Sequence, residues 1–451
     1  MDNREVEIEI TDLAFNGKSV GHVDGKVVFV NGGLPGETIL AEIYRSKPRY
    51  DDARLLKIIK PSERRVPPIC AHFDYCGGCT WQDLTYEDQL GFKKKQVIDC
   101  LERLGGLEDT TVHDVIGSVE VFRYRNKMEF SFHTGQDDSF TLGLHRRGRF
   151  DEIFDLEQCH LTHDIASEIV KWMRDYVRQA ELPVYDVIEH TGYMRFVMLR
   201  QSKRTADLMV NLVTNTGNFP EPDRLVHQMI TAFPQITTIV HNQNGQKSNI
   251  AVGEIEKTLF GCGYIEERLF ESVFRIRANS FFQTNTVQTE TLYRTGFEML
   301  EPRRDYRVLD LYCGAGSIGI LVSQYVDDVI GVELVSDAIH SARENAHLNK
   351  IENIRFHEAN VADFLKDKEI TSQQFNVIIV DPPRAGLHPK ALKRLLRLLP
   401  EKILYISCNP STFARDAKDI VAAGYSLPDV RPVDMFPHTM HIELASVFHR
   451  T

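Results

Sequence analysis

The chain has 451 residues, 42% of them hydrophobic and 26% charged, and its formal net charge of −11 excludes a uniformly basic nucleic-acid binder. This length exceeds what one compact core usually holds, so we expect two or three domains. The sequence has neither an N-terminal apolar run nor a stretch long enough to span a bilayer. We therefore expect a cytoplasmic protein with no membrane partner.

The first sixty residues contain short alternating apolar runs separated by turn signals. Each run fits one strand, and Asp24-Gly25 between two of them is a hairpin signal; the runs are VEIEI, KSVGHV, KVVFV, ETILAEIY and ARLLKII. Five strands in so short a segment predict a small barrel of the OB-like kind over 1–63. On this pattern an RNA-binding and a purely structural barrel remain equally open.

A polar, proline-containing stretch at 61–68 predicts a domain boundary, and clustered cysteines follow it. Cys70, Cys76 and Cys79 lie close together in the sequence, and Cys159 is the candidate fourth ligand. In a chain without a secretory signal, such cysteines indicate metal ligands or catalytic thiols before disulfides. Four thiols suit zinc or an iron–sulfur cluster, and their spacing leaves both open.

Basic and aromatic residues alternate in the central part of the chain, which we assign to an α+β domain over 64–270. The stretches 122–133 and 143–150 mix Arg and Lys with aromatic rings, as a surface for single-stranded RNA requires. The run Lys93-Lys94-Lys95 lies on a predicted helix, where a solvated face is the expected arrangement.

Beyond residue 280 apolar strands alternate with helical stretches. RVLDLYCGAGSIGILV combines a strand, a glycine turn and a helix start; VIGVELV ends near Glu333; NVIIVDPPRAG places Asp381 just past a third strand. KILYISCNP supplies a fourth strand and presents Cys408 at its end. The pattern predicts a doubly wound, mostly parallel α/β (Rossmann-like) domain over 271–451, with ligands at the carboxyl ends of its strands.

The glycine turn indicates a nucleotide-type cofactor. Gly314, Gly316 and Gly319 satisfy GxGxxG, and Glu333 could bind the ribose of any adenosine-containing cofactor, NAD included. Asp-Pro-Pro and Cys-Asn-Pro at two successive strand ends favour methyl transfer to a base from S-adenosylmethionine (SAM). Cys408 is then a candidate nucleophile, although a buried structural cysteine would give the same local pattern.

Several motifs in one order resemble the RNA uracil-C5 methyltransferase family, the RumA/TrmA type. The cysteine set is most similar to the iron–sulfur, ribosomal-RNA branch, and the resemblance also implies a TRAM-like barrel at the N-terminus. The motifs are FFQTN (281–285), LDLYCGAGSIG (309–319), DPPRAG (381–386), SCNP (407–410) and PHTMHIE (437–443).

The resemblance implies two cofactors and their ligands. A [4Fe-4S] cluster rather than zinc would be held by Cys70, Cys76, Cys79 and Cys159. The family often has Asn where this chain has Ser317, and a serine can still donate a hydrogen bond. The SAM-contacting residues implied are Gln283, Tyr312, Gly314, Ser317, Glu333, Asn360 and Asp381.

The resemblance also implies a covalent mechanism. The Cys408 thiolate would add to C6 of uracil, and Glu443 would remove the C5 proton before elimination. His438 and His441 are candidate partners of these groups. The target uridine must leave its stack, so we expect a loop or single-stranded RNA segment as substrate.

The expected substrate is 23S ribosomal RNA, with transfer RNA as the alternative and a monomer as the expected state. Two other functions remain open. One is a cytosine-C5 methyltransferase, which shares the covalent chemistry. The other is an RNA-binding or assembly factor on a methyltransferase scaffold.

Overall fold

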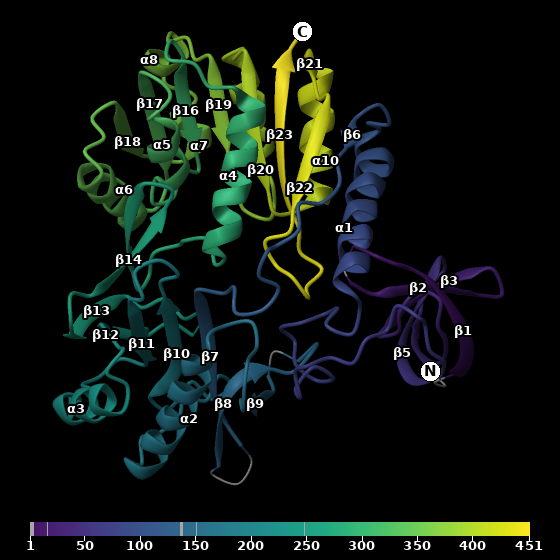
Figure 1. Cartoon of the computed structure of the whole chain (residues 1–451), viewed down its shortest axis with the longest axis vertical. Helices are drawn as coiled ribbons and strands as arrows, with labels where there is room; N and C mark the ends of the chain where they lie inside the picture. The colour runs from purple at the N-terminus through teal and green to yellow at the C-terminus, as the bar shows by residue number, and fades with distance from the viewer. Residues whose placement is uncertain (1–3, 16, 136–138, 150, 248) are drawn as a thin grey trace.

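The computed structural model describes residues 4–15, 17–135, 139–149, 151–247 and 249–451, and its sheets divide the chain into three bodies (Figure 1). Phe150, the last residue of the predicted RNA-binding stretch 143–150, lies outside these ranges. No helix in the described ranges is long and apolar enough to cross a membrane.

The first body is a closed five-stranded barrel in the order β1-β2-β3-β5-β4, which confirms the barrel predicted from the alternating runs. Its strands are β1 (Arg4–Leu13), β2 (Ser19–Val23), β3 (Lys26–Asn31), β4 (Thr38–Ser46) and β5 (Tyr50–Lys60). Asp24 and Gly25 both have left-handed φ angles, 52° and 78°, as a two-residue hairpin turn requires. Alternate residues of β1, among them Ile8 and Ile10, fill the barrel interior.

The central body is a seven-stranded sheet in the order β13-β12-β11-β10-β7-β8-β9. Ile169, Val170, Met173 and Val177 are fully buried on one face of α2 (Asp164–Gln179), at the spacing of a helix that covers a sheet. A second helix, α3 (Pro222–Ala232), follows β11. The strands are β7 (Lys127–Thr134), β8 (Phe140–His145), β9 (Ile153–Asp155), β10 (Met194–Gln201), β11 (Leu208–Thr214), β12 (Thr238–Gln243) and β13 (Ile255–Phe260).

A hairpin of β14 (Tyr264–Leu269) and β15 (Ser272–Arg277) leads from the central body to the third, which is a doubly wound sheet as predicted. The strand order is β18-β17-β16-β19-β20-β23-β22-β6, and β21 pairs with β23. The first five strands are parallel, whereas β23 is antiparallel to β20. The strands are β16 (Arg307–Leu311), β17 (Asp328–Glu333), β18 (Ile354–Glu358), β19 (Val377–Val380), β20 (Lys402–Ser407), β21 (Tyr425–Ser426), β22 (Asp429–Val433) and β23 (Glu443–Arg450).

Helices cover both faces of this sheet, because its strands are apolar on both sides. They are α4 (Thr286–Leu300), α5 (Ser317–Val322), α6 (Ser336–Leu348), α7 (Val361–Phe364), α8 (Lys368–Thr371), α9 (Pro389–Arg397) and α10 (Pro410–Ala422).

One earlier segment also packs on the third body, although it lies within the stretch 64–270 assigned to the central domain. α1 (Tyr86–Cys100) and the single π-turn η1 (Leu101–Gly105) contact α10, and β6 (Thr111–Val112) pairs with β22 (Figure 1). The solvated face expected for Lys93-Lys94-Lys95 is wrong for Lys93, whose side chain is completely buried. The face of α1 that carries Gln89 and Lys93 is covered by the loop that follows β22.

Candidate active site

A cavity of about 1480 Å³ opens at the carboxyl ends of β16, β17, β19 and β20. All nine residues predicted for the SAM site and for catalysis line it. They come from seven separate segments of the sequence, which the sheet brings to one edge. These residues are Gln283, Tyr312, Gly314, Ser317, Glu333, Asn360, Asp381, Cys408 and Glu443.

Backbone amides fix the Glu333 carboxylate at one end of the cavity. Its Oε2 accepts from the Gly314 N–H at 3.2 Å, and its Oε1 accepts from the N–H groups of Leu334 (2.7 Å) and Val335 (3.0 Å). A carboxylate held in this way is ordered before any ligand arrives, and its remaining lone pairs can accept hydrogen bonds from hydroxyl groups.

The turn after β16 is shaped by left-handed residues. Tyr312 has φ of 64°, which is unfavourable for an aromatic residue and is found mainly where function requires it. Gly316 has φ of 81°, and a Cβ there would lie 3.0 Å from the Phe356 ring and 3.1 Å from Ala342 Cβ. The left-handed backbone and the close packing of this turn therefore favour glycine at position 316.

Hydrogen bonds on both sides of Cys408 define the turn that presents it. The Asn409 N–H donates to Ser407 Oγ at 3.2 Å, and the Asn409 side chain accepts from the Ser411 N–H at the start of α10. The same side chain donates to the Arg384 carbonyl at 3.0 Å. These contacts tie the Cys408 turn to the 381–386 loop, so that the half-buried thiol faces the cavity between them.

Glu443 reaches the same place from the opposite direction along the sheet. Ser407 pairs with Leu444 across the antiparallel β20–β23 ladder, so the next position on each side brings Cys408 level with Glu443. The Glu443 side chain is buried, and its Oε2 accepts no hydrogen bond from any residue that the structure describes. An orphaned buried acceptor of this kind is costly unless a ligand or a proton satisfies it.

Negative charge is disfavoured throughout this part of the cavity. Burial, with the neighbouring charges of Glu443 and Asp381, raises the pKa of Cys408 to about 12. Burial raises the pKa of Asp381 to about 7, and burial together with Asp381 raises the pKa of Glu443 well above its usual range. The Arg384 guanidinium opposes the shifts at Cys408 and Glu443. A bound cation would favour the ionised forms of all three acidic groups.

The two candidate histidines differ in position. His441 lines the cavity, and burial together with Arg384 lowers its pKa to about 4, so its imidazole is neutral near pH 7. His438 does not line the cavity; it stacks on Phe122 with ring centroids 4.2 Å apart. Only His441 is therefore placed to meet a ligand.

The cavity lining also includes residues to which the sequence prediction assigned no role, among them Arg125, Phe281, Arg384 and Phe436. Phe281 is 71% exposed, whereas the next residue, Phe282, is in the core. Adjacent residues in an extended segment point in opposite directions, so the pair Phe281-Phe282 could have indicated that one ring is exposed. The Arg125 guanidinium lies 5.7 Å from the centre of the Phe436 ring, a contact between distant segments that no local pattern indicates.

The four clustered cysteines come together in the central body. Cys76, Cys79 and Cys159 are buried in one apolar cluster, Cys70 packs against it, and all four are free thiols. The Gly78 N–H donates to Cys76 Sγ at 3.3 Å. Within the described residues, no three His, Cys, Asp or Glu side chains form a group that could hold a metal ion, so the predicted metal site is not shown and stays a prediction.

Two family models together match most of the chain. Residues 85–451 match the model of the tRNA (uracil-5-)-methyltransferase family, and residues 1–56 match the TRAM domain. An uncharacterized RNA methyltransferase of Chlorobaculum tepidum is 39% identical, with 99% of this chain and 96% of the relative covered. Another from Porphyromonas gingivalis is 38% identical over 97% of this chain and 98% of the relative.

A solved structure agrees over the whole length. The Pyrococcus abyssi tRNA (uracil-54, C5)-methyltransferase, in complex with S-adenosyl-L-homocysteine, superposes with a TM-score of 0.79 at 32% identity. The match covers 98% of this chain and 100% of the Pyrococcus chain. The chain is an RNA methyltransferase with an N-terminal TRAM domain, and it belongs to the tRNA (uracil-5-)-methyltransferase family.

Proposed function

We propose that this protein transfers a methyl group from SAM to C5 of a uridine in RNA through a covalent adduct between Cys408 and C6. One observation carries the proposal: Cys408 and Glu443 meet across the β20–β23 edge in one cavity, with Asp381 beside them. A nucleophile, a buried carboxylate and a cofactor-sized space on one rim are what this reaction needs.

The glycine turn, the fixed Glu333 carboxylate and Asp381 would hold SAM, with Gln283, Tyr312, Ser317 and Asn360 around them. The residues present fit the cofactor: Glu333 suits the ribose hydroxyls, and the acidic groups suit the positive sulfonium. SAM supplies an electrophilic methyl group. The S-adenosyl-L-homocysteine bound to the Pyrococcus relative supports this cofactor.

Cys408 begins the reaction because C5 of uracil is only a weak nucleophile. Addition of the thiolate to C6 would form the C–S bond and move an electron pair toward O4, giving an enolate. C5 of this enolate would then take the methyl group, with cleavage of the methyl–sulfonium bond and S-adenosyl-L-homocysteine as the leaving group. Glu443 then takes the C5 proton, the C–S bond breaks, and the thiolate leaves as the double bond re-forms. Arg384 and the charge of the bound sulfonium both favour the thiolate of Cys408.

We also propose that Cys70, Cys76, Cys79 and Cys159 hold a [4Fe-4S] cluster. Four free thiols share an apolar cluster, with the Gly78 N–H and Gln82 Nε2 directed at their sulfurs, as cluster ligands require. A cubane distributes its four thiolates over four irons, so the thiols need not converge on one ion. A bound cluster would join the 70–79 segment to Cys159 and stabilise the surface beside the cavity.

The proposed substrate is a loop or single-stranded segment of 23S ribosomal RNA, because the four-cysteine set resembles that of the ribosomal-RNA branch. Transfer RNA is the second candidate, and the substrate named for the Pyrococcus relative favours it. In either case the uridine must be unstacked to reach Cys408 at the base of the cavity.

The test uses methyl-labelled SAM with separate pools of unmodified ribosomal and transfer RNA, followed by nucleoside digestion and mass spectrometry. We expect label in 5-methyluridine from the ribosomal pool. Label only in the transfer-RNA pool would replace the substrate and keep the chemistry, whereas 5-methylcytidine would identify a cytosine enzyme. RNA binding without any labelled pyrimidine would indicate the assembly-factor function instead.

A further inference from the structure

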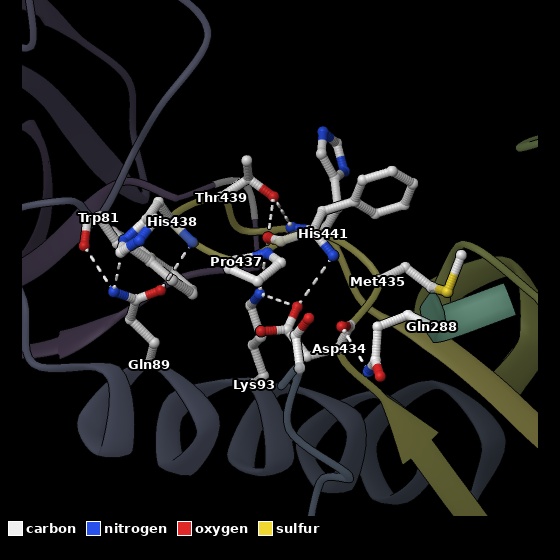
Figure 2. A network of polar contacts seen from close by, with 12 residues as sticks. Trp81, Gln89, Lys93, Gln288, Asp434, Met435, Pro437, His438, Thr439 and His441 are labelled. Atoms are coloured by element: carbon white, nitrogen blue, oxygen red, sulfur yellow. Dashed lines mark hydrogen bonds and ion pairs between the residues drawn. The ribbon is translucent and has the colours of Figure 1, made fainter. Parts of the chain in front are cut away.

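The loop 434–442 closes the hairpin between β22 and β23 and delivers Glu443 to the cavity. Val433 pairs with Glu443 at its base, and Phe436 and His441 line the cavity from its two halves. Figure 2 shows side chains of α1 pointing at this loop from below. The position of Glu443 therefore depends on how the loop is held.

The first contact is a completely buried ion pair. Lys93 Nζ lies 2.7 Å from Asp434 Oδ1, and neither side chain has any exposed surface. Tyr86 donates its hydroxyl to the other Asp434 oxygen at 2.9 Å. A buried pair of this kind contributes little net stability, because both charges lose their hydration. Its main effect here is to fix the positions of the two side chains.

The pair holds the backbone of Phe436 from both sides. Lys93 Nζ donates to the Phe436 carbonyl at 3.1 Å, and Asp434 Oδ1 accepts from the Phe436 N–H at 3.1 Å. The Phe436 ring in turn meets the His441 ring edge-on, with centroids 6.1 Å apart. Lys93 thus acts on the cavity wall without lining the cavity itself.

The second contact fixes His438, which has a left-handed φ of 64°. Gln89 accepts from the His438 N–H at 2.8 Å, and its amide nitrogen lies 3.2 Å from His438 Nδ1. The N–H groups of Thr80 and Trp81 both donate to the His438 carbonyl, at 2.8 and 3.0 Å. A strained residue with so many partners is held in one conformation by its surroundings.

Helix α4 holds the loop from its opposite side. Gln288 donates to the Asp434 carbonyl and Asn285 to the Met435 carbonyl, each at 3.0 Å. Among the described residues, the turn that carries Cys408 makes none of these contacts and is tied to the Arg384 carbonyl. Its side-chain contact with α1 joins Ser411 to Cys100, the last residue of that helix and about two or more turns beyond Lys93 and Gln89. Displacement of the loop would therefore move Glu443 and leave the nucleophile in place.

We propose that Lys93, Asp434 and Gln89 are positioning residues for the elimination half of the reaction, since they hold Glu443 within reach of the C5 proton of the methylated adduct. The inference rests on the proposed function, in which Glu443 is the base. It assigns to these residues, two of them on a helix outside the cavity, an effect on the elimination step and not on the addition of Cys408 to C6.

The test follows one turnover of RNA and SAM in two variants, Lys93→Met/Asp434→Asn and Gln89→Leu. The first removes both charges together and so leaves no unpaired buried charge. Formation and decay of the protein–RNA adduct are followed separately by denaturing electrophoresis. We expect adduct formation close to the wild-type rate and adduct decay slower by about tenfold to a hundredfold, so that methylated adduct accumulates.

A matched control is Arg65→Met/Glu37→Gln/Asp83→Asn, which neutralises a buried ion cluster of Arg65 with Glu37 and Asp83 that does not contact the loop. We expect this variant to accumulate no adduct. Wild-type decay rates in the folded loop variants, or equal slowing of both steps, would overturn the inference. If wild-type protein forms neither adduct nor product, the proposed function itself is wrong.

Discussion

At the residue scale, the cavity is built to disfavour negative charge until a cation enters. Burial raises the pKa of Asp381 to about 7, and Asp310, buried beneath the glycine turn near Asp381, has its pKa raised to about 8. Glu443 is shifted in the same direction. These raised pKa values favour the protonated forms of the carboxyl groups, and the sulfonium of SAM would favour release of their protons.

The first prediction concerns this proton release. SAM carries a positive sulfonium and S-adenosyl-L-homocysteine does not. SAM binding should therefore lower the raised pKa of Asp381 more than binding of S-adenosyl-L-homocysteine does, and it should release more protons. Because release is easier at higher pH, SAM affinity should rise relative to S-adenosyl-L-homocysteine between about pH 6 and pH 8. Calorimetry in buffers of different ionisation enthalpy measures the protons released.

Asp381→Asn is the control, and it should remove most of the difference in proton release between the two ligands. Equal proton release by SAM and S-adenosyl-L-homocysteine in the wild-type protein would show that the cavity carboxyls do not respond to the sulfonium.

At the element scale, two elements shape the cavity at the edge of the sheet. They are the turn between β16 and α5 and the antiparallel strand β23. The turn lets the backbone approach a cofactor, with Gly316 closely surrounded by Phe356 and Ala342. Strand β23 reverses direction and so brings a carboxylate from the C-terminal end of the chain beside Cys408. A fully parallel sheet would have placed Glu443 at the opposite edge.

The second prediction tests the crowding at Gly316. Gly316→Ala forces a left-handed alanine and a Cβ only 3.0 Å from Phe356, so it should lower the free energy of unfolding by about 2–4 kcal/mol and weaken SAM binding. Gly424→Ala is the matched control, because Gly424 has φ of 94° and its nearest neighbour is 4.0 Å away. Urea denaturation should show the control variant losing only about 1 kcal/mol. Equal losses would mean that packing at Gly316 is not tight.

The sequence predicted the elements whose signals are local. The Asp24-Gly25 hairpin and the apolar strands β16, β17, β19 and β20 follow from a few neighbouring residues. The pairing of β6 with β22 does not, because two residues of strand carry no recognisable pattern. Lys93 looked solvated within its run of lysines, and only the distant Asp434 explains its burial.

The candidate site divides in the same way. Its residues lie at predicted strand ends and within recognised motifs, so the sequence indicated them before their proximity was known. Phe436, Arg125 and the neutral state of His441 depend on contacts between segments far apart in the chain. Such contacts are fixed by tertiary packing alone.

At the scale of the whole molecule, three bodies converge on the loop that carries Glu443. A Cβ at Gly17 of the barrel would lie 2.9 Å from Thr80 Cγ2 and 3.1 Å from Met440 Sδ. The barrel, the segment after Cys79 and the loop 434–442 therefore touch at one place. RNA held by the barrel would lie beside the contacts that position the proposed base.

The third prediction concerns the cysteines behind this junction. Protein purified without oxygen should be brown and contain about four irons per chain, and Cys159→Ser should lose both colour and iron. Cys100→Ser and Cys262→Ser should keep them, because Cys100 bonds Ser411 and Cys262 is exposed in the turn between β13 and β14. Metal analysis with visible absorbance measures this, and a colourless protein with zinc would contradict the cluster.

The central claim is that Cys408 and Glu443 act in sequence on the same uridine. Its most direct test is mass spectrometry of denatured protein after incubation of Glu443→Gln with RNA and SAM. We predict a stable adduct that carries one methyl group on the nucleotide and maps to Cys408, and no adduct when Cys408→Ala is added to the same chain. Free 5-methyluridine formed at the wild-type rate by either variant would contradict the covalent mechanism.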